Sequence, residues 1–301
     1  MNNWNPQKII DLLVECSKIA LHYYGNTEKE LKSDRSIVTI ADKNIEKLLS
    51  EHFDKPLSGS YLIGEETIFE KSEEYIKEAL NSTTWVVDPI DGTAPYSNHL
   101  PHWGISIGYM QKGIIKEGAI FLPCTNELFI TDNEKVYFKH IKNSKKDYNF
   151  ESFNELSKPI KELNDSEIIS LTQSFAKNFH IDIHNPIQVL SCATFSFTYT
   201  LLGRFIAYVG SSIKLWDYAA ALIMLKLLDI NVSFFDKTEL SCDIRKNHNL
   251  IGNSQYKWNI KNRIITTANE NIINYIINNS KNKKLTRSTI NEESPNSDKI
   301  G

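Results

Sequence analysis

Residues 85–93 read Trp-Val-Val-Asp-Pro-Ile-Asp-Gly-Thr, a run of three apolar residues that leads into two acidic residues on either side of a proline. Apolar and β-branched residues bounded by turn-forming residues are typical of a short buried strand. Proline has no N–H to donate, so Pro89 interrupts a regular strand. We therefore expect a strand over 84–87 that ends at Asp88 and passes into a turn.

This turn would bring several oxygen donors together. It directs the carboxylates of Asp88 and Asp91, the carbonyl of Ile90 and the hydroxyl of Thr93 toward one point, and Gly92 relieves crowding of the backbone. Such donors suit Mg²⁺ better than zinc, which prefers histidine and cysteine. Adjacent carboxylates repel each other unless divalent cations neutralise them. Two such ions can hold the attacking and leaving oxygens of a phosphoryl group.

Asp-Pro and Asp-Gly pairs also occur in ordinary turns, so this interpretation depends on two further acidic motifs. Residues 64–66 read Gly-Glu-Glu and follow the apolar segment 61–63. Asp217 opens an apolar helix that we expect over 216–228. Acidic residues at the ends of apolar segments are displayed on a rigid scaffold, which favours a shared metal site.

With these three motifs the sequence resembles the inositol monophosphatase family of Mg²⁺-dependent, Li⁺-sensitive phosphatases. Residues 88–93 match the first signature of that family without a change, and residues 216–220 match its second signature. Residues 64–66 match its upstream metal motif, and residues 38–42 match the segment before it. The order and rough spacing of the motifs hold over 8–280.

The resemblance implies a site with two or three Mg²⁺ ions. The ligands of the first ion would be Glu65, Asp88, the Ile90 carbonyl and Thr93. Those of the second ion would be Asp88, Asp91 and Asp217. Glu65 would also hold a weaker third ion through water.

The resemblance also implies the catalytic and substrate-binding residues. Asp42 with Thr93 would orient and deprotonate the attacking water, and hydrolysis would proceed by direct in-line attack without a phosphoenzyme. The residues expected to face the substrate are Gly92, Thr93, Ser191, Cys192, Ala193 and Lys214. Two lysines keep two interpretations each: Lys214 either reaches the phosphate or lies in water, and Lys32 either offsets negative charge near the metals or lies on the surface.

The sequence departs from the family pattern around the substrate pocket. Leu190 precedes Ser191 where the family usually has a glycine, and the arginine usually just upstream is absent. Gly210 stands where many inositol-specific members carry a glutamate. None of these changes touches an expected metal ligand. They leave the phosphatase interpretation intact and weaken the assignment of inositol as the substrate.

Hydrophobic periodicity predicts a mixture of helices and strands. We expect helices over 6–24, 41–53, 70–80, 193–202, 216–228 and 270–279. We expect strands over 84–87, 103–110, 114–121, 127–131, 135–140, 168–172, 205–209, 232–235 and 264–267. This mixture predicts a layered α/β (α+β) architecture, and the resemblance implies an αβαβα sandwich of the inositol monophosphatase or sugar phosphatase type.

The polar stretch 141–166 is the best candidate for a boundary between two portions. We expect an α+β N-terminal portion over 1–145 and an α/β C-terminal portion over 146–280, with the active site at their junction. Residues 281–301 are polar and aperiodic, so we expect a disordered tail.

Composition excludes several classes of protein. Of 301 residues only 12 are glycine, 41% are hydrophobic and the formal net charge is −3. A near-neutral chain lacks the basic footprint of a nucleic-acid-binding protein. Its four cysteines form no Cys-x-x-Cys pair, and it contains no long apolar run. We expect a cytoplasmic protein with reduced thiols that binds neither nucleic acid nor membrane, with a homodimer left open.

The function expected from the sequence is Mg²⁺-dependent hydrolysis of a small phosphorylated metabolite, with an inositol-1-phosphate-like compound as the leading substrate. Three alternatives come from the same superfamily: 3′-phosphoadenosine 5′-phosphate, histidinol phosphate and fructose 1,6-bisphosphate. An alternative of another class is a pseudoenzyme that acts as a binding protein.

Overall fold

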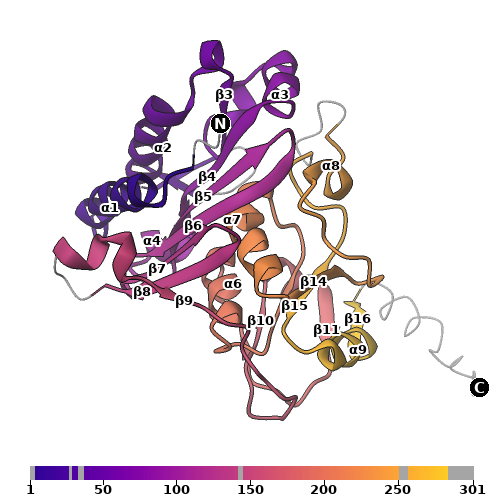
Figure 1. Cartoon of the computed structure of the whole chain (residues 1–301). Helices are drawn as coiled ribbons and strands as arrows, with labels where there is room; N and C mark the ends of the chain where they lie inside the picture. The colour runs from indigo at the N-terminus through magenta and orange to yellow at the C-terminus, as the bar shows by residue number, and fades with distance from the viewer. Residues whose placement is uncertain (1–3, 27–28, 33–36, 142–144, 251–256, 284–301) are drawn as a thin grey trace, which may run out of the picture.

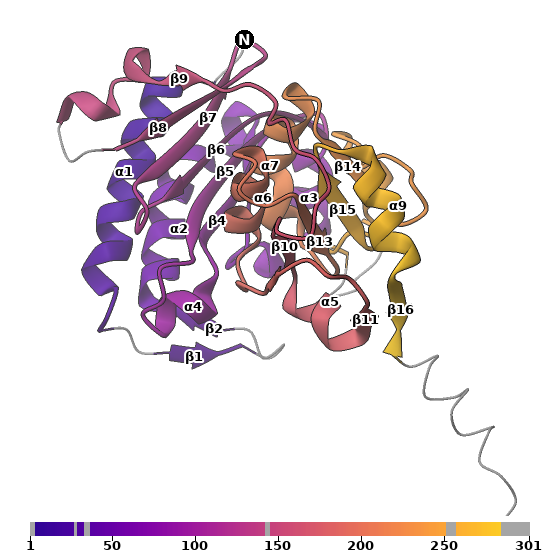
Figure 2. The same ribbon diagram turned by 90° about the horizontal axis from the view of Figure 1, so that it is seen from below.

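Two large β-sheets alternate with three layers of helices through the protein, which gives five layers (Figures 1 and 2). The computed structural model describes residues 4–26, 29–32, 37–141, 145–250 and 257–283. In the described part of the chain the helical layers lie outside the first sheet, between the two sheets and outside the second sheet. This arrangement confirms the predicted αβαβα sandwich.

The first sheet has the strand order β3-β4-β5-β6-β7-β8-β9. Its strands are β3 (Ser60–Gly64), β4 (Thr83–Asp91), β5 (Gly104–Gln111), β6 (Ile114–Leu122), β7 (Glu127–Asp132), β8 (Lys135–His140) and β9 (Asn154–Glu155). Only β3 and β4 run parallel, and the other neighbours are antiparallel. The helices α1 (Pro6–Tyr23) and α2 (Ile40–Phe53) cover its outer face and bury Ile10, Leu13, Ile45 and Leu49.

Strand β4 positions two of the expected metal ligands. Its Trp85 and Val87 side chains pack in the core beneath α1 and α2, whereas Val86 packs in the core between the sheets. Alternate residues of a strand share a face, so Asp88 lies on the inner face with Val86. The expected turn at Pro89 is wrong, because β4 continues to Asp91.

A bulge replaces that turn. Asp88 pairs with Ser106 and Asp91 pairs with Gly104, so three steps along β4 match two steps along β5. Without the extra residue, side chains three positions apart would lie on opposite faces of the sheet. The bulge therefore returns Asp91 to the face that carries Asp88 and leaves Ile90 in the outer core.

The second sheet has the order β12-β10-β13-β15-β14. Its strands are β10 (Ile169–Leu171), β12 (Ile187–Gln188), β13 (Ala207–Gly210), β14 (Asn231–Phe234) and β15 (Ile264–Thr267). The helices α5 (Gln173–Asn178) and α9 (Glu270–Asn278) lie on its outer side. Phe175, Ile272 and Ile276 of these helices pack with Ile169, Val209 and Ile265 of the sheet.

Helices α6 (Ala193–Leu201) and α7 (Leu215–Leu227) fill the space between the sheets (Figure 2). Both are buried almost all round, and the hydroxyl groups that α6 carries at Thr198 and Thr200 donate to carbonyls of the same helix. Helix α7 approaches the first sheet very closely. An added methyl group at Gly118 would collide with the backbone of Ala220, and one at Gly108 would lie 3.0 Å from the Cβ of Ala219.

Shorter elements complete the fold. They are α3 (Glu73–Ala79), α4 (Thr93–Ser97), α8 (Ile244–Asn247), β1 (Lys29–Leu31), β2 (Ile37–Thr39), β11 (Phe179–Ile181), β16 (Ser280–Asn282), and single turns of 3-10 helix at Pro56–Ser58, Ile68–Glu70, Lys145–Tyr148 and Phe150–Ser152. The sequence analysis did not anticipate most of them. Among the described residues, no helix combines the length and the apolar character that crossing a membrane requires.

Two expected boundaries lie elsewhere in the structure. Strand β9 pairs with β8 in the first sheet, so the chain leaves that sheet after Glu155, beyond the expected boundary at 145. Strand β16 pairs with β11, so the segment expected as a tail begins with ordered residues. The rest of that segment, 284–301, lies outside the described residues. The core between the sheets contains side chains from both expected portions, which therefore share it.

Candidate metal centre and active site

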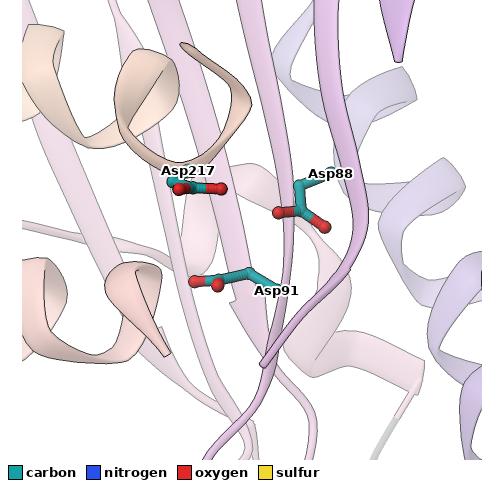
Figure 3. A group of neighbouring side chains, drawn as sticks. All are labelled: Asp88, Asp91 and Asp217. Carbon is teal, nitrogen blue, oxygen red and sulfur yellow. The ribbon is translucent and has the colours of Figure 1, made fainter. Parts of the chain in front are cut away.

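Three carboxylates converge where β4 meets the first turn of α7. Asp88, Asp91 and Asp217 each offer an oxygen, and these oxygens all lie within 4.8 Å of one another. Figure 3 shows the three side chains pointing toward a common space between the strand and the helix. Carboxylates so close together repel each other, and divalent cations are the usual means of neutralising them.

Asp88 is the central member of this group. It is only 1% exposed, and neither of its carboxylate oxygens has a hydrogen-bond partner among the described residues. Burial, and then the charges of Glu65, Asp91 and Asp217, raise the pKa of Asp88 well above its usual range. Buried oxygens normally have hydrogen-bond partners, so an unpartnered carboxylate in an all-oxygen cluster fits a divalent cation such as Mg²⁺.

Asp91 is held by the start of α6. Its Oδ2 accepts a hydrogen bond of 2.5 Å from the backbone N–H of Thr194 and one of 3.3 Å from the thiol of Cys192. Burial raises the pKa of Asp91, and hydrogen bonds from Thr194, Cys192 and the Ala193 backbone oppose that rise. Cys192 and Ala193, expected to face the substrate phosphate, line a cavity that also reaches Asp91 and Asp217, and the Cys192 thiol additionally contacts Asp91.

Asp217 is oriented by its own helix. Its Oδ2 accepts a hydrogen bond of 2.9 Å from the backbone N–H of Lys214, the residue that caps α7. Burial, followed by the charges of Asp91 and Glu65, raises the pKa of Asp217 well above its usual range. The second oxygen is thus left to face the cluster.

Glu65 lies beside this cluster, outside the group of three carboxylates. Its Oε1 is 3.2 Å from the ammonium of Lys214 and 3.9 Å from that of Lys32. Lys32 also pairs with Glu66 at 2.7 Å. Both lysines therefore offset negative charge next to the cluster. For Lys32 this agrees with the first of its two interpretations, whereas Lys214 makes an ion pair that neither of its interpretations included. Asp217 and Glu65 are in this way linked through Lys214.

Glu46 is a further residue of the site, and no sequence motif singled it out. Its carboxylate is buried and accepts hydrogen bonds from the backbone N–H groups of Glu66 (2.9 Å) and Thr67 (2.8 Å) and from the Thr67 hydroxyl (2.7 Å). It also lies against Gly64, where an added methyl group would collide with it. Glu46 thus fixes the turn that carries Glu65. The signal was present, because Glu46 follows Asp42 by one helical turn on the buried side of α2.

Asp42 lies at the start of α2, next to the cluster. Its Oδ2 accepts hydrogen bonds from the Thr39 backbone (2.8 Å) and the Thr39 hydroxyl (2.5 Å). Its Oδ1 is 3.5 Å from the Thr93 hydroxyl, which also donates to the Ile90 carbonyl at 3.1 Å. Burial raises the pKa of Asp42 to about 7, against the lowering effect of the Thr39 hydrogen bonds. The expected pairing of Asp42 with Thr93 is therefore present.

Two backbone positions shape the floor of the site. Gly92 has a φ of 88° at the start of α4, and an added methyl group there would lie 2.8 Å from the carbonyl oxygen of His102. Ser191 has a φ of 55°, so the left-handed residue before α6 is Ser191 itself. Ser191 thus has the backbone conformation that glycine adopts most readily, whereas Leu190, at the position where the family pattern has glycine, is not among the residues with positive φ. Ser191 is exposed and lines a cavity of about 220 Å³ that also reaches Asp91 and Asp217.

Carboxylates that converge between a strand and a helix are an arrangement that enzymes with divalent metal ions use. The sequence profile of the inositol monophosphatase family matches residues 9–273, so the chain belongs to that family.

Individual relatives agree with this membership. The chain is 25% identical over 222 residues to a fructose-1,6-bisphosphatase/inositol-1-monophosphatase of Thermotoga maritima, covering 72% of this chain and 79% of the relative. It is 30% identical over 125 residues to a histidinol-phosphatase of Chlorobaculum parvum, covering 41% of this chain and 46% of the relative. Its fold is similar to that of an IMPase/NADP phosphatase in complex with Mg²⁺ and phosphate, with a TM-score of 0.67, 19% identity, and coverage of 90% of this chain and 96% of the other.

Proposed function

We propose that this protein is a Mg²⁺-dependent phosphomonoesterase that hydrolyses a small phosphorylated metabolite. The observation that carries the proposal is the pair of buried, unpartnered oxygens of Asp88 inside a cluster of three carboxylates. Membership in a family of phosphatases supports it. No structural role explains Asp88, because a carboxylate that only stabilised the fold would have hydrogen-bond donors around it.

The residues that would hold the metal ions are those nearest Asp88. Asp88, Asp91 and Asp217 would bind one ion, and Asp88, Glu65, the Ile90 carbonyl and Thr93 would bind another. A third ion would be held by Glu65 through water. Bound Mg²⁺ supplies Lewis-acid activation of water and charge neutralisation of the phosphate.

The other residues have the task of holding the water and the substrate. Asp42, with a pKa raised to about 7, is suited to accept a proton near neutral pH, and Thr93 lies between it and the Ile90 carbonyl. The backbone N–H groups at the start of α4, after Gly92, are suited to hold phosphate oxygens. Ser191 faces the cavity next to the metal site and is the candidate contact from α6.

An inositol-phosphate-like compound is the leading substrate, and the names of several relatives support it. Gly210 in place of an expected glutamate argues against strict inositol specificity. The alternatives are 3′-phosphoadenosine 5′-phosphate, histidinol phosphate and fructose 1,6-bisphosphate, of which the last two also appear in the names of relatives. We further propose inhibition by Li⁺, a cytoplasmic location and a homodimer as properties that accompany this function.

The test is a phosphate-release assay on these four substrates with Mg²⁺, with and without Li⁺. We expect Mg²⁺-dependent release from at least one substrate, inhibition by Li⁺, and loss of activity in Asp88→Asn while the protein stays folded. Near-normal activity of Asp88→Asn would refute the proposed metal site. Mg²⁺ binding without phosphate release from any of them would instead favour a binding protein.

A further inference from the structure

A second, larger cavity adjoins the metal site. Its volume is about 590 Å³, and it lies between the end of α5, the start of β11 and the segment that precedes β15. Three of its lining residues, Ser174, Ser211 and Ser212, also line the smaller cavity at Asp91 and Asp217. The two cavities are therefore neighbours on either side of these three serines, so a ligand that passes over the serines would have one end near the metal site and the other in the larger cavity.

The three serines form a hydrogen-bonded row, called here the threshold, between the two cavities. The hydroxyl of Ser211 donates to that of Ser174 at 3.0 Å, and the latter donates to Ser212 at 3.3 Å. The backbone N–H of Ser211 is fixed by the Thr172 hydroxyl at 3.1 Å. Hydroxyl groups can both donate and accept, so the threshold is suited to a polar, uncharged middle part of a ligand.

The larger cavity is positively charged. The charged residues among those described that line it are Lys261 and Arg263, and no aspartate or glutamate lines it in the described part of the chain. The remaining lining is mainly asparagine and serine. This sign is opposite to that of the neighbouring carboxylate cluster and to the net charge of the chain, −3.

Arg263 is held in a fixed position within this cavity. Its guanidinium carbon lies 4.6 Å from the centre of the Phe179 ring and 4.4 Å from that of the Phe235 ring. Its carbonyl accepts a hydrogen bond of 3.1 Å from the Phe235 N–H. Stacking uses the faces of a guanidinium and leaves its N–H groups free at the edge, where they match the oxygens of a phosphate or carboxylate. Among the described residues, no carboxylate pairs with Arg263.

We propose that the larger cavity binds a second anionic group of the substrate, a phosphate or a carboxylate, on the part of the molecule that leaves. The inference rests on the proposed phosphatase activity and narrows its substrate class. The preferred substrate is then a doubly anionic phosphomonoester, such as fructose 1,6-bisphosphate or 3′-phosphoadenosine 5′-phosphate among the alternatives above. Inositol 1-phosphate, a phosphorylated neutral polyol, becomes a poorer substrate and loses its leading place. Arg263 is the specificity-determining residue and Lys261 adds to the local positive charge.

Matched pairs of substrates test the proposal in the Mg²⁺-loaded full chain. Fructose 1,6-bisphosphate is compared with fructose 1-phosphate, and 2-phosphoglycerate with glycerol 2-phosphate. We expect a higher kcat/KM for the doubly anionic member of at least one pair. A preference in the first pair alone identifies a phosphate as the second group, and a preference in the second pair alone identifies a carboxylate.

Arg263→Met keeps an unbranched apolar side chain between the two rings and removes the charge. We expect it to lower kcat/KM for the preferred doubly anionic substrate by about 10- to 100-fold, the usual effect of losing hydrogen bonds to a charged group. For the singly anionic partner we expect a change below about threefold. Lys135→Met on β8 makes the same change in net charge far from the cavity and serves as the matched control. Equal losses for both members of a pair, or no preference in the unsubstituted protein, would overturn the proposal.

Two further measurements show whether a loss of preference comes from misfolding of the variant or from a lack of catalytic turnover. Arg263→Lys retains the charge and the aliphatic stem but loses the planar guanidinium, so it should keep part of the preference and serves as the second variant if Arg263→Met is poorly folded in thermal unfolding. Calorimetric binding of fructose 6-phosphate and of 3-phosphoglycerate does not depend on turnover. If no substrate releases phosphate, the proposed function fails. The anion subsite then stands only if Arg263→Met weakens the binding of one of these ligands, and it falls if both bind unchanged.

Discussion

Replacing Asp88 with asparagine should stabilise the metal-free protein while it abolishes the response to Mg²⁺. The carboxylate of Asp88 is buried beside Asp91 and Asp217, and neither of its oxygens has a partner among the described residues. Burial raises its pKa well above the usual range, so folding the metal-free protein near neutral pH costs free energy, either as a buried charge or as the uptake of a proton. Asparagine has almost the same shape and carries no charge, so the substitution removes this part of the cost and leaves a neutral buried amide.

The magnitude follows from the burial. A buried polar group without a partner costs about 1–3 kcal/mol, and more when it is charged. We expect the free energy of unfolding of metal-free Asp88→Asn to exceed that of the unsubstituted protein by about 1–3 kcal/mol at pH 7.5. For a chain of this size that corresponds to about 2–3 °C in Tm per kcal/mol.

The sign of the pH dependence gives an independent check. A carboxylate whose folded-state pKa is raised contributes stability at low pH and loses it as pH rises through that pKa. The difference between Asp88→Asn and the unsubstituted protein should therefore shrink as pH falls toward the ordinary pKa of a carboxyl group, because the folded and the unfolded chain then both bind the proton. Chemical denaturation with EDTA and with Mg²⁺, at several pH values, measures both effects.

Glu127→Gln on β7 is the matched control. Glu127 is equally buried, but its Oε1 pairs with Arg204 at 2.6 Å. Neutralising a paired carboxylate leaves the arginine without its partner, so Glu127→Gln should destabilise the protein and leave its response to Mg²⁺ intact. A lower stability of metal-free Asp88→Asn, or a normal increase in its stability with Mg²⁺, would refute the reasoning.

Three further predictions concern the surroundings of the site. His248 shares a 2.7 Å hydrogen bond with Tyr218, and burial lowers its pKa to about 4. A histidine whose folded-state pKa is lowered contributes stability above its usual pKa of 6.5. We expect about 3 kcal/mol of the free energy of unfolding to be lost as pH falls from there to 4. His248→Gln should flatten that decline in acid denaturation curves, and an unchanged curve would contradict the assignment. Gly64→Ala should weaken Mg²⁺ binding about tenfold or more in calorimetry, because the added methyl group displaces Glu46; unaltered affinity would show that this turn does not position a ligand. Asp42→Asn should lower kcat by about 10²- to 10⁴-fold while Mg²⁺ still raises Tm, and loss of both responses would make Asp42 a structural residue instead.

Most long elements could be predicted from the sequence because their periodicity is local. The helices that begin at Pro6, Ile40 and Leu215 and the strand meander from Gly104 to His140 lie close to their expected ranges. The acidic motifs were equally visible, since each stands where an apolar segment meets a turn or a helix start. Their convergence on one space could be expected only from the family resemblance, because the three aspartates come from two distant segments.

The errors have definite physical causes. A proline was expected to end β4, but a bulge accommodates Pro89 and keeps the strand paired as far as Asp91. The contact of the Cys192 thiol and the Thr194 backbone with Asp91 was not expected, because it joins the start of α6 to β4 across the fold. Glu46 escaped notice because its role depends on a contact with Gly64 across the fold. Each of these features depends on tertiary packing, which a local pattern does not encode.

The close approach of α7 to the first sheet has a consequence for the choice of metal ion. Gly118 and Ala220 meet backbone to backbone, so the distance between helix and sheet is set where no side chain is present to adjust it. Asp217 belongs to the helix and Asp88 to the sheet, so this contact also sets the distance between their carboxylates. The contact between Gly118 and Ala220 therefore limits the radius of the cation that fits, although neither residue would contact that cation. A methyl group added at Gly118 would increase the distance between α7 and the first sheet and so between the carboxylates. A search for variants that prefer a larger ion should begin at this position.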